Sequence, residues 1–442
     1  MTKTGRSAAL WAAALWAPAL LALALAGCSR AQPARPPAAP ATAPVADQAW
    51  VQLTDRGAEV RLATAAPACP PIAVDGADLP MRRRAAPDAD FPVTVCEALL
   101  PKGARHAAVG GRALPLPSPE PKRLVIFGDT GCRLKGGDIQ NCDKPAEWPF
   151  AQVARLAAAH HPDLVIHVGD YYYRESPCPA GRAGCAGSPW GDNWTTWAAD
   201  FFAPARPLLD AAPWVLVRGN HEDCARGGPG WFLLLDNGPA PLTCPAASAP
   251  MAVDVGGLTL YVLDSSGTVD QAAPPGAVAA FAAQLDALKA HPSAGPAWIV
   301  THRPIWGLAP VVRLGPFGPL EVAINATEQA AARGRDLSGV DMVVSGHIHH
   351  FASFAFQGAR PPQLIVGTGG DVGEPGDSPR FIAGQVNVDG MSARRFGFDR
   401  YGFLVLDRTP TGWAGSFYDV RDRPIADCRL AGRQLDCHAA RP

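Results

Sequence analysis

The sequence predicts a layered α/β fold with buried sheets and flanking helices, preceded by a small all-β domain. Beyond residue 122, short and continuous apolar runs alternate with alanine-rich stretches. Such runs are typical of strands covered on both faces, and the stretches between them are long enough for helices. From residue 50 to residue 116, shorter runs alternate between apolar and polar residues and are broken by Pro and Gly, which indicates β structure.

The chain has the composition of a globular protein. It has 442 residues, of which 48% are hydrophobic and 18% are charged, so it is long enough for two domains with a sizeable core. The formal net charge is -1, and no acidic tail is visible. A chain without a basic field is not expected to bind nucleic acid, whereas the composition leaves other partners and the oligomeric state open.

The first residues resemble a bacterial lipoprotein signal. Two basic residues precede an apolar run over residues 8–26, which is too short and too lightly flanked to favour a stable membrane span. The small pair before Cys28 resembles a lipobox, in which the cysteine is lipidated and becomes the mature N-terminus. We therefore expect residues 1–27 to be a signal peptide. The protein would then be an exported bacterial lipoprotein, anchored through Cys28 on the periplasmic or cell-surface side; ordinary cleavage beside an unmodified Cys28 is the alternative.

Composition divides the rest of the chain into three segments. Residues 28–48 are rich in Ala and Pro and carry little charge, which predicts an extended tether between the lipid and the protein. Residues 49–116 form the predicted small β domain, and a second Pro-rich link follows it. Residues 122–442 form the predicted α/β domain, in which we expect the chemistry to lie.

The cysteines predict disulfides. Eleven are present, and setting Cys28 aside leaves ten, an even number in a chain that we expect to be exported. Disulfides are therefore expected, whereas metal sites built from thiolates are not. Sequence alone leaves the connectivity open, and pairing between near neighbours is the simplest arrangement. It would join Cys69 with Cys96, Cys132 with Cys142, Cys178 with Cys185, Cys224 with Cys244, and Cys428 with Cys437.

Seven apolar runs in the α/β region are candidate strands. They cover residues 124–127, 164–167, 214–217, 258–263, 297–301, 342–344 and 364–366. Alanine-rich stretches at residues 150–160 and 277–290 are candidate helices. Continuous apolar strands with helices between them predict sheets that are buried on both faces.

Polar loops that contain glycine and a potential metal ligand follow five of these strands. The loops are Gly128-Asp129-Thr130-Gly131, Gly169-Asp170-Tyr171-Tyr172-Tyr173, Gly219-Asn220-His221-Glu222, Thr301-His302-Arg303-Pro304 and Gly346-His347-Ile348-His349. Because sites assemble at the carboxyl ends of strands in α/β sheets, the five loops can converge on one point. A lone Gly-Asp is usually a turn and a lone histidine is usually structural, so the ordered set carries the signal.

The ordered motifs GDTG, GDYYY, GNHE, VTH and GHIH resemble those of the calcineurin-like metallophosphoesterases. The tyrosine three places after Asp170 is similar to the GDxxY motif of the purple acid phosphatases within that superfamily. The resemblance covers roughly residues 123–371 and implies a metallophosphoesterase-type β-sandwich flanked by helices. The small β domain resembles the N-terminal domain of larger members. One departure is visible, because the family's VxxH loop here reads Ile299-Val300-Thr301-His302.

The resemblance also implies two metal ions that share one ligand, Asp170. The first, Fe(III), would be held by Asp129, Asp170, Tyr173 and His349. The second, a divalent Fe, Zn or Mn ion, would be held by Asp170, Asn220, His302 and His347. Carboxylates and a phenolate suit a hard trivalent ion, whereas an amide oxygen and two imidazoles suit a divalent one.

By the same resemblance, a metal-bound hydroxide would attack the phosphorus atom of a small phosphorylated substrate. His221 would then be the proton donor or a hydrogen-bonding stabiliser on the leaving-group side, and Glu222 would orient His221. The implied function is that of an acid phosphatase acting on monoesters. A phosphodiesterase or nucleotide hydrolase on the same scaffold is an alternative. A surface lipoprotein that binds metal or phosphate without turnover is another.

Overall fold

The structure is a computed structural model that describes residues 47–241, 243–313, 319–371 and 380–441. These residues belong to one unit of the chain, Pro44–Pro442. The predicted signal peptide, Cys28 and most of the tether lie outside the described residues. Within the described part of the chain, no helix has the length and apolar character needed to cross a bilayer.

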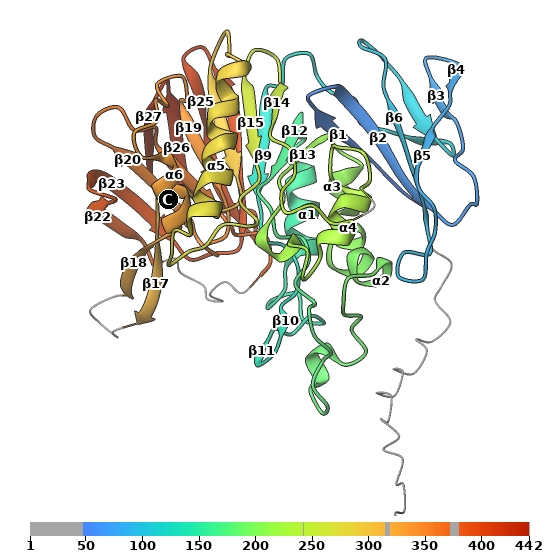
Figure 1. The fold of residues 1–442 in the computed structure, drawn as a ribbon, viewed down its shortest axis with the longest axis horizontal. Coiled ribbons are helices and arrows are strands. Elements are labelled where there is room, and N and C mark those ends of the chain that lie inside the picture. Colours follow the sequence, from blue (N-terminus) through green and yellow to red (C-terminus); the bar gives the residue numbers. More distant parts are fainter. Residues whose placement is uncertain (1–46, 242, 314–318, 372–379, 442) are drawn as a thin grey trace, which may run out of the picture. The chain divides into compact units, whose positions relative to one another are not determined.

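The first large sheet has eleven strands, and parallel strands form its centre (Figure 1). These are β9 (Arg123–Phe127), β12 (Leu164–His167) and β13 (Trp214–Leu216). Antiparallel strands extend the sheet beyond β9: β24 (Gly402–Thr409), β25 (Gly412–Asp419), β26 (Pro424–Ala431) and β27 (Gln434–Ala439). Beyond β13 the sheet continues with β1 (Gln48–Thr54), β2 (Gly57–Thr64), β6 (Thr94–Leu99) and β5 (Arg82–Ala85).

The second large sheet has eight strands and a parallel centre as well. Its parallel strands are β15 (Thr259–Leu263), β16 (Ala297–Thr301), β19 (Met342–Ser345) and β21 (Gln363–Val366). Antiparallel strands complete it: β14 (Met251–Asp254), β20 (Phe351–Phe356), β23 (Met391–Phe398) and β22 (Ile382–Val388).

The two sheets pack face to face over one apolar core. Ile126 and Ile166 of the first sheet belong to the same buried cluster as Val262, Val300 and Val344 of the second. In the central parallel strands, residues on the opposite face are also buried, which explains why these strands are apolar without alternation. The layered sandwich therefore confirms the predicted fold class.

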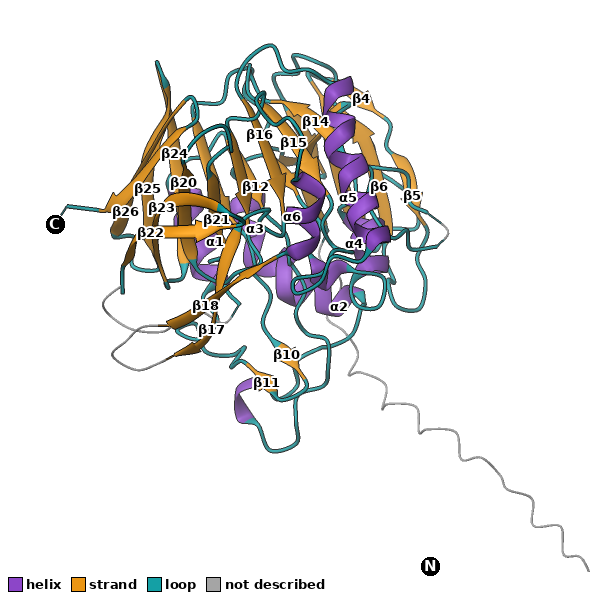
Figure 2. Ribbon diagram, turned by 60° about the vertical axis from the view of Figure 1, so that its left-hand side comes forward, coloured by secondary structure: helices purple, strands orange, loops and turns teal. Residues whose placement is uncertain are grey.

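Helices cover the outer faces of both sheets. Phe150 of α1 (Phe150–Ala159) and Leu208 of α3 (Ala203–Leu209) pack against Phe127 and Val165 of the first sheet. Helices α5 (Pro275–Ala287) and α6 (Ala326–Ala332) lie side by side over the second sheet (Figure 2). The remaining helices are short: η1 (Ala183–Cys185), α2 (Trp194–Trp197), η2 (Ala198–Phe202), η3 (Asn220–Glu222), α4 (Gly228–Leu234) and η4 (Leu288–Ala290).

All seven predicted strands are present in the structure. The two predicted helices are found as α1 and as α5 followed by η4. Besides the antiparallel strands β14, β20 and β22 to β27, two small hairpins were not predicted, β10 (Leu134–Lys135) with β11 (Asp138–Ile139), and β17 (Gly307–Arg313) with β18 (Pro319–Ile324). Both are too short or too irregular in sequence to show the strict alternation that reveals a strand.

The predicted N-terminal β region is built from strands, as expected. Besides β1, β2, β5 and β6, it contains a four-stranded sheet of β3 (Ile72–Val74), β4 (Ala77–Leu79), β7 (Ala107–Val109) and β8 (Arg112–Ala113). Its own cluster of buried residues includes Val51, Leu62 and Ile72. Because β1 pairs in parallel with β13, this region also continues the main sheet. The boundaries of the small domain stay a prediction.

All five predicted disulfides are confirmed. They join Cys69 to Cys96, Cys132 to Cys142, Cys178 to Cys185, Cys224 to Cys244, and Cys428 to Cys437. Each therefore closes a short local loop, as near-neighbour pairing requires.

Candidate metal centre

The five predicted loops converge on one place. β9, β12 and β13 run parallel in the first sheet, and β15, β16 and β19 run parallel in the second. Their carboxyl ends therefore reach one edge of each sheet, and the ligand-bearing loops begin there. Asp129 and Asp170 follow strands of the first sheet, whereas His302 and His347 follow strands of the second, and contacts join the two pairs.

One group of side chains surrounds the phenol oxygen of Tyr173. This oxygen lies 3.1 Å from Asp129 Oδ1, 2.7 Å from Asp170 Oδ2 and 3.1 Å from His349 Nε2. His349 Nε2 also lies 3.3 Å from Asp129 Oδ1. The tyrosine and both aspartates are buried. The structure thus brings together the four side chains predicted to hold the first metal ion.

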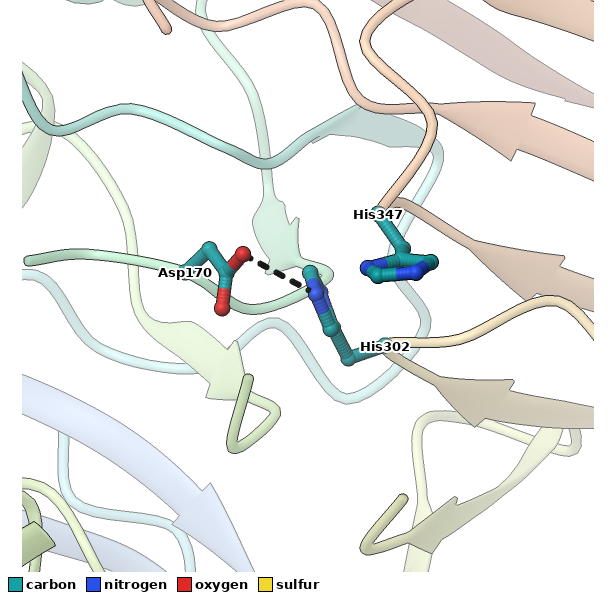
Figure 3. A group of neighbouring side chains, drawn as sticks. All are labelled: Asp170, His302 and His347. Carbon is teal, nitrogen blue, oxygen red and sulfur yellow. Dashed lines mark ion pairs between the residues drawn. The ribbon is translucent and has the colours of Figure 1, made fainter. Parts of the chain in front are cut away.

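A second group surrounds the ring of His302. His302 Nε2 lies 3.1 Å from Asp170 Oδ2 and 3.1 Å from Asn220 Oδ1. One possible ligand atom from each of Asp170, His302 and His347 lies within 4.8 Å of the other two (Figure 3). The four side chains predicted to hold the second metal ion are therefore also neighbours, and Asp170 belongs to both groups.

The electrostatics of this centre suit cations. Burial disfavours the charge on Asp170, but His302 and His221 outweigh it and hold the pKa of Asp170 well below its usual range. Burial also opposes a charge on His302, yet Asp170 raises the pKa of His302 to about 9. Burial, together with Asp170 and Asp129, raises the pKa of Tyr173 well above its usual value. Buried oxygen and nitrogen atoms that face one another are costly unless a partner binds them, and a cation is such a partner. The residues present therefore fit a pair of metal ions.

His221 lies at the border of this centre. Its backbone N–H donates to Asp170 Oδ1 over 2.9 Å, and its Nε2 lies 3.9 Å from Asp170 Oδ2. Its ring centroid is 3.9 Å from that of Tyr173. Burial lowers the pKa of His221, and Asp170 and the Glu175 side chain oppose this shift. The imidazole is thus close to both groups of ligands and is buried beside them.

Glu222 does not orient His221, and the predicted contact between them is wrong. Its carboxylate instead accepts backbone N–H bonds from Gly219 over 2.9 Å, Asp170 over 3.1 Å, Tyr171 over 2.8 Å and Tyr172 over 3.1 Å. With four donors from the backbone, the carboxylate has no oxygen left for an imidazole. Glu222 therefore holds the loop that carries Asp170 rather than the histidine next to it in sequence.

Glu175 is the carboxylate that contacts His221, and sequence reasoning missed it. Its Oε1 lies against His221 Nδ1. Arg226 Nη1 lies 3.4 Å away from the same oxygen, and Lys135 Nζ lies 3.7 Å from the other. The only signal in the sequence was an acid two places after Tyr173, outside the motif that drew attention.

Three of the ligand-bearing loops contain a residue with an unusual backbone conformation. Asp129, Asp170 and His347 have φ angles of 59°, 60° and 69°, in the left-handed region that non-glycine residues rarely adopt. Such strain is tolerated where the surroundings hold the chain, and it gathers at functional sites. Gly219 is required for a different reason, because a Cβ atom there would overlap Asp170 Oδ1 and the Asp170 backbone nitrogen.

The sequence of residues 122–351 matches the family model described as calcineurin-like phosphoesterase, which is more than half of the chain. The chain belongs to the calcineurin-like phosphoesterase family. It is therefore a metal-dependent phosphoester hydrolase, and the family implies a small phosphorylated substrate.

This phosphoesterase is similar to two solved structures, and of these PhoD shows the fold. The purple acid phosphatase PPD1 from yellow lupin (Lupinus luteus) seeds is 15% identical with a TM-score of 0.49, and the alignment covers 86% of this chain and 72% of that one. The structure of PhoD is 11% identical with a TM-score of 0.50, and the alignment covers 90% of this chain and 92% of that one. No curated protein matches the sequence.

Replacing Gly219 with Ala tests the need for space beside Asp170. We expect the added methyl group to displace Asp170, to destabilise the fold by about 1–3 kcal/mol, and to weaken metal binding. Urea denaturation and metal analysis of the purified phosphoesterase measure both effects. Gly276→Ala is the matched control, because nothing lies within 4 Å of a Cβ atom there. Equal stability and metal content in the two variants would contradict the argument.

Proposed function

We propose that this phosphoesterase is a dinuclear-metal acid phosphatase that hydrolyses phosphate monoesters. The observation that carries the proposal is the position of the Tyr173 phenol oxygen, within 3.1 Å of Asp129, Asp170 and His349. A phenolate at this point is a hard anionic ligand, which favours a trivalent ion over a divalent one. This feature supports an iron-containing centre.

The two groups of side chains would hold different ions. Fe(III) would be bound by Asp129, Asp170, Tyr173 and His349, and a divalent Fe, Zn or Mn ion by Asp170, Asn220, His302 and His347. Two cations bound there would polarise the phosphoryl group and lower the pKa of the water that attacks phosphorus. The protein contributes the shared Asp170 carboxylate and a buried setting that strengthens electrostatic interactions.

His221 assists the departure of the leaving group. Glu175 contacts Nδ1 of His221, so the other ring nitrogen, Nε2, is the one that faces Asp170. From there Nε2 can hydrogen-bond to the leaving-group oxygen or give it a proton. Glu175 is a positioning residue, since it acts on the substrate only through the ring of His221.

A cavity of about 860 Å³ beside His349 favours a second candidate, a phosphodiesterase or nucleotide hydrolase. Arg133, Arg182 and Tyr401 are among its lining residues. Sites for small organic ligands have volumes of about 300–1,000 Å³, so a second ester group has room there. Comparing p-nitrophenyl phosphate with bis(p-nitrophenyl) phosphate separates the two candidates. Hydrolysis of neither ester would instead favour a lipoprotein that binds metal or phosphate without turnover.

The proposed cell location is the outer side of a bacterial membrane, with a lipid on Cys28. Five disulfides in the described chain support an oxidising compartment. The lipobox-like residues before Cys28 support the anchor.

Tyr173→Phe tests the ferric assignment. The purified protein should contain iron and absorb visible light through charge transfer from the tyrosinate to Fe(III). The variant lacks the phenol oxygen, so the band should disappear while the fold is kept. Absorption spectra and metal analysis of both proteins measure this. A colourless, iron-free and active wild-type protein would contradict the ferric assignment and leave only the broader phosphoesterase reaction.

Glu175→Gln tests the role of His221 through the leaving group. With its ring less well placed, His221 should lose most of its effect, which for general acid catalysis is about 10²- to 10⁴-fold in rate. We expect kcat to fall about tenfold more for an alkyl phosphate than for p-nitrophenyl phosphate, whose leaving group needs little protonation. The control is Glu120→Gln, because Glu120 is an exposed acid paired with Lys122. Equal losses for both substrates would show that Glu175 does not act through His221.

Cys28→Ala tests the lipid anchor. In a bacterial host, the wild-type protein should fractionate with membranes and carry a lipid on its N-terminal peptide. The variant should be soluble or remain unprocessed, since a lipidated N-terminus needs the thiol. Membrane fractionation and mass spectrometry measure both. Unchanged membrane association of the variant would show that Cys28 is not the anchor.

A further inference from the structure

Two histidines of the metal centre each have their second ring nitrogen against an aspartate outside the predicted ligand set. His349 Nε2 faces Tyr173, and its Nδ1 lies 3.4 Å from Asp371 Oδ2. His347 Nε2 lies 3.0 Å from Asp270 Oδ1, so Nδ1 is the nitrogen left for the centre. In Figure 3 the ring of His347 stands beside His302, across from the carboxylate of Asp170.

Asp371 is held rigidly behind His349. It is buried, and Arg133 Nε donates to its Oδ1 over 3.0 Å. The guanidinium carbon of Arg133 also lies 4.9 Å from the ring centroid of Tyr173. The backbone N–H of Asp371 donates to the carbonyl oxygen of Asp129 over 2.8 Å. The carboxylate is thus fixed by both its side chain and its backbone, next to the first group of ligands.

Asp270 lies behind His347 and also pairs with an arginine, but its side chain is 37% exposed, unlike that of Asp371. Arg303 Nη1 contacts Asp270 Oδ1 and lies 3.2 Å from His347 Nε2. The carbonyl oxygen of Asp270 accepts the backbone N–H of Ala326 over 2.9 Å, at the start of α6. Thr327 of the same helix donates its hydroxyl to a carbonyl of this loop over 3.1 Å. The loop that presents Asp270 is therefore attached to the second sheet and its covering helix.

We propose that Asp371 and Asp270 are positioning residues, one for each metal ion. Asp371 orients His349 so that Nε2 faces the first ion, and Asp270 orients His347 so that Nδ1 faces the second. This proposal rests on the two-metal centre of the proposed function. It adds two residues that belong to none of the predicted motifs.

The physical basis is the proton on the second ring nitrogen. A neutral imidazole carries one N–H, and a carboxylate at one nitrogen draws the proton there and frees the lone pair of the other. Such a partner also fixes the ring and makes it a stronger ligand, and its removal commonly weakens metal binding 10- to 100-fold. His302 differs, because its Nδ1 lies 2.8 Å from the backbone carbonyl of Val168.

Removing the charge of either carboxylate should weaken the binding of one metal ion and leave the binding of the other unchanged. Metal-free protein is titrated calorimetrically with Zn²⁺, and the wild type should show two binding events. Asp270→Asn should weaken one event about 10- to 100-fold, and Asp371→Asn should weaken the other by a similar factor. In iron-loaded protein, Asp371→Asn should diminish the tyrosinate band, whereas Asp270→Asn should keep it.

Two further variants guard against general damage to the fold. Asp286→Asn is the control, because this aspartate also pairs with an arginine but lies on α5, and it should leave both events unchanged. Since Asp371 is buried, Arg133→Lys provides a milder change, which should weaken only the event that Asp371→Asn weakens. Thermal unfolding of the metal-free proteins reports whether the fold is kept.

Unchanged affinities in both aspartate variants would overturn the proposal, and so would an equal weakening of both events by either one. A wild type that binds two ions but hydrolyses no monoester would contradict the proposed function alone. A wild type that binds fewer than two ions would contradict the proposed function and this inference together.

Discussion

The Asp170 carboxylate is the contact on which the arrangement of this centre depends. Its Oδ2 is within 3.1 Å of both the Tyr173 phenol oxygen and His302 Nε2, and its Oδ1 accepts the backbone N–H of His221. One buried side chain therefore joins both groups of ligands, and each group combines side chains from loops of both sheets. These distances are kept only if the apolar core between the two sheets fixes the position of one sheet relative to the other.

A buried carboxylate at this position requires that the loop carrying Asp170 is held in place. Asp170 has a positive φ angle, and Glu222 holds the loop in this shape by accepting four backbone N–H bonds. Buried acids are destabilising unless hydrogen bonds or cations satisfy them. Glu222 is satisfied by the backbone, whereas Asp170 and Asp129 share their surroundings with imidazoles and a phenol. The structure thus separates an acid that shapes the loop from acids that are available to a cation.

The sequence was sufficient to predict the parts of this molecule that follow from local patterns. Continuous apolar runs predicted the central strands, and near-neighbour pairing predicted the disulfides. The candidate metal ligands could be proposed from the sequence because each lies in a loop that follows a strand, and the motifs of these loops resemble those of a known family. The partner of His221 could not, since Glu222 is adjacent in sequence but points at the backbone, and Glu175 comes from another loop. The pairing of β1 with β13 also joins distant residues and leaves no periodic signal.

The carboxylates that the motifs did not reveal follow a common physical rule. Glu175, Asp270 and Asp371 each contact both a histidine of the centre and an arginine. The arginines are Arg226, Arg303 and Arg133, respectively.

An arginine keeps its charge at any ordinary pH, so it stabilises the ionised form of the carboxylate beside it. The carboxylate then remains an acceptor for the histidine N–H while its two oxygens are held in place. Each of the three carboxylates is thus kept ionised by an arginine and can hold the ring of its histidine in one orientation. The centre therefore combines ligands set by the strand ends with partners that only the packing of separate loops supplies.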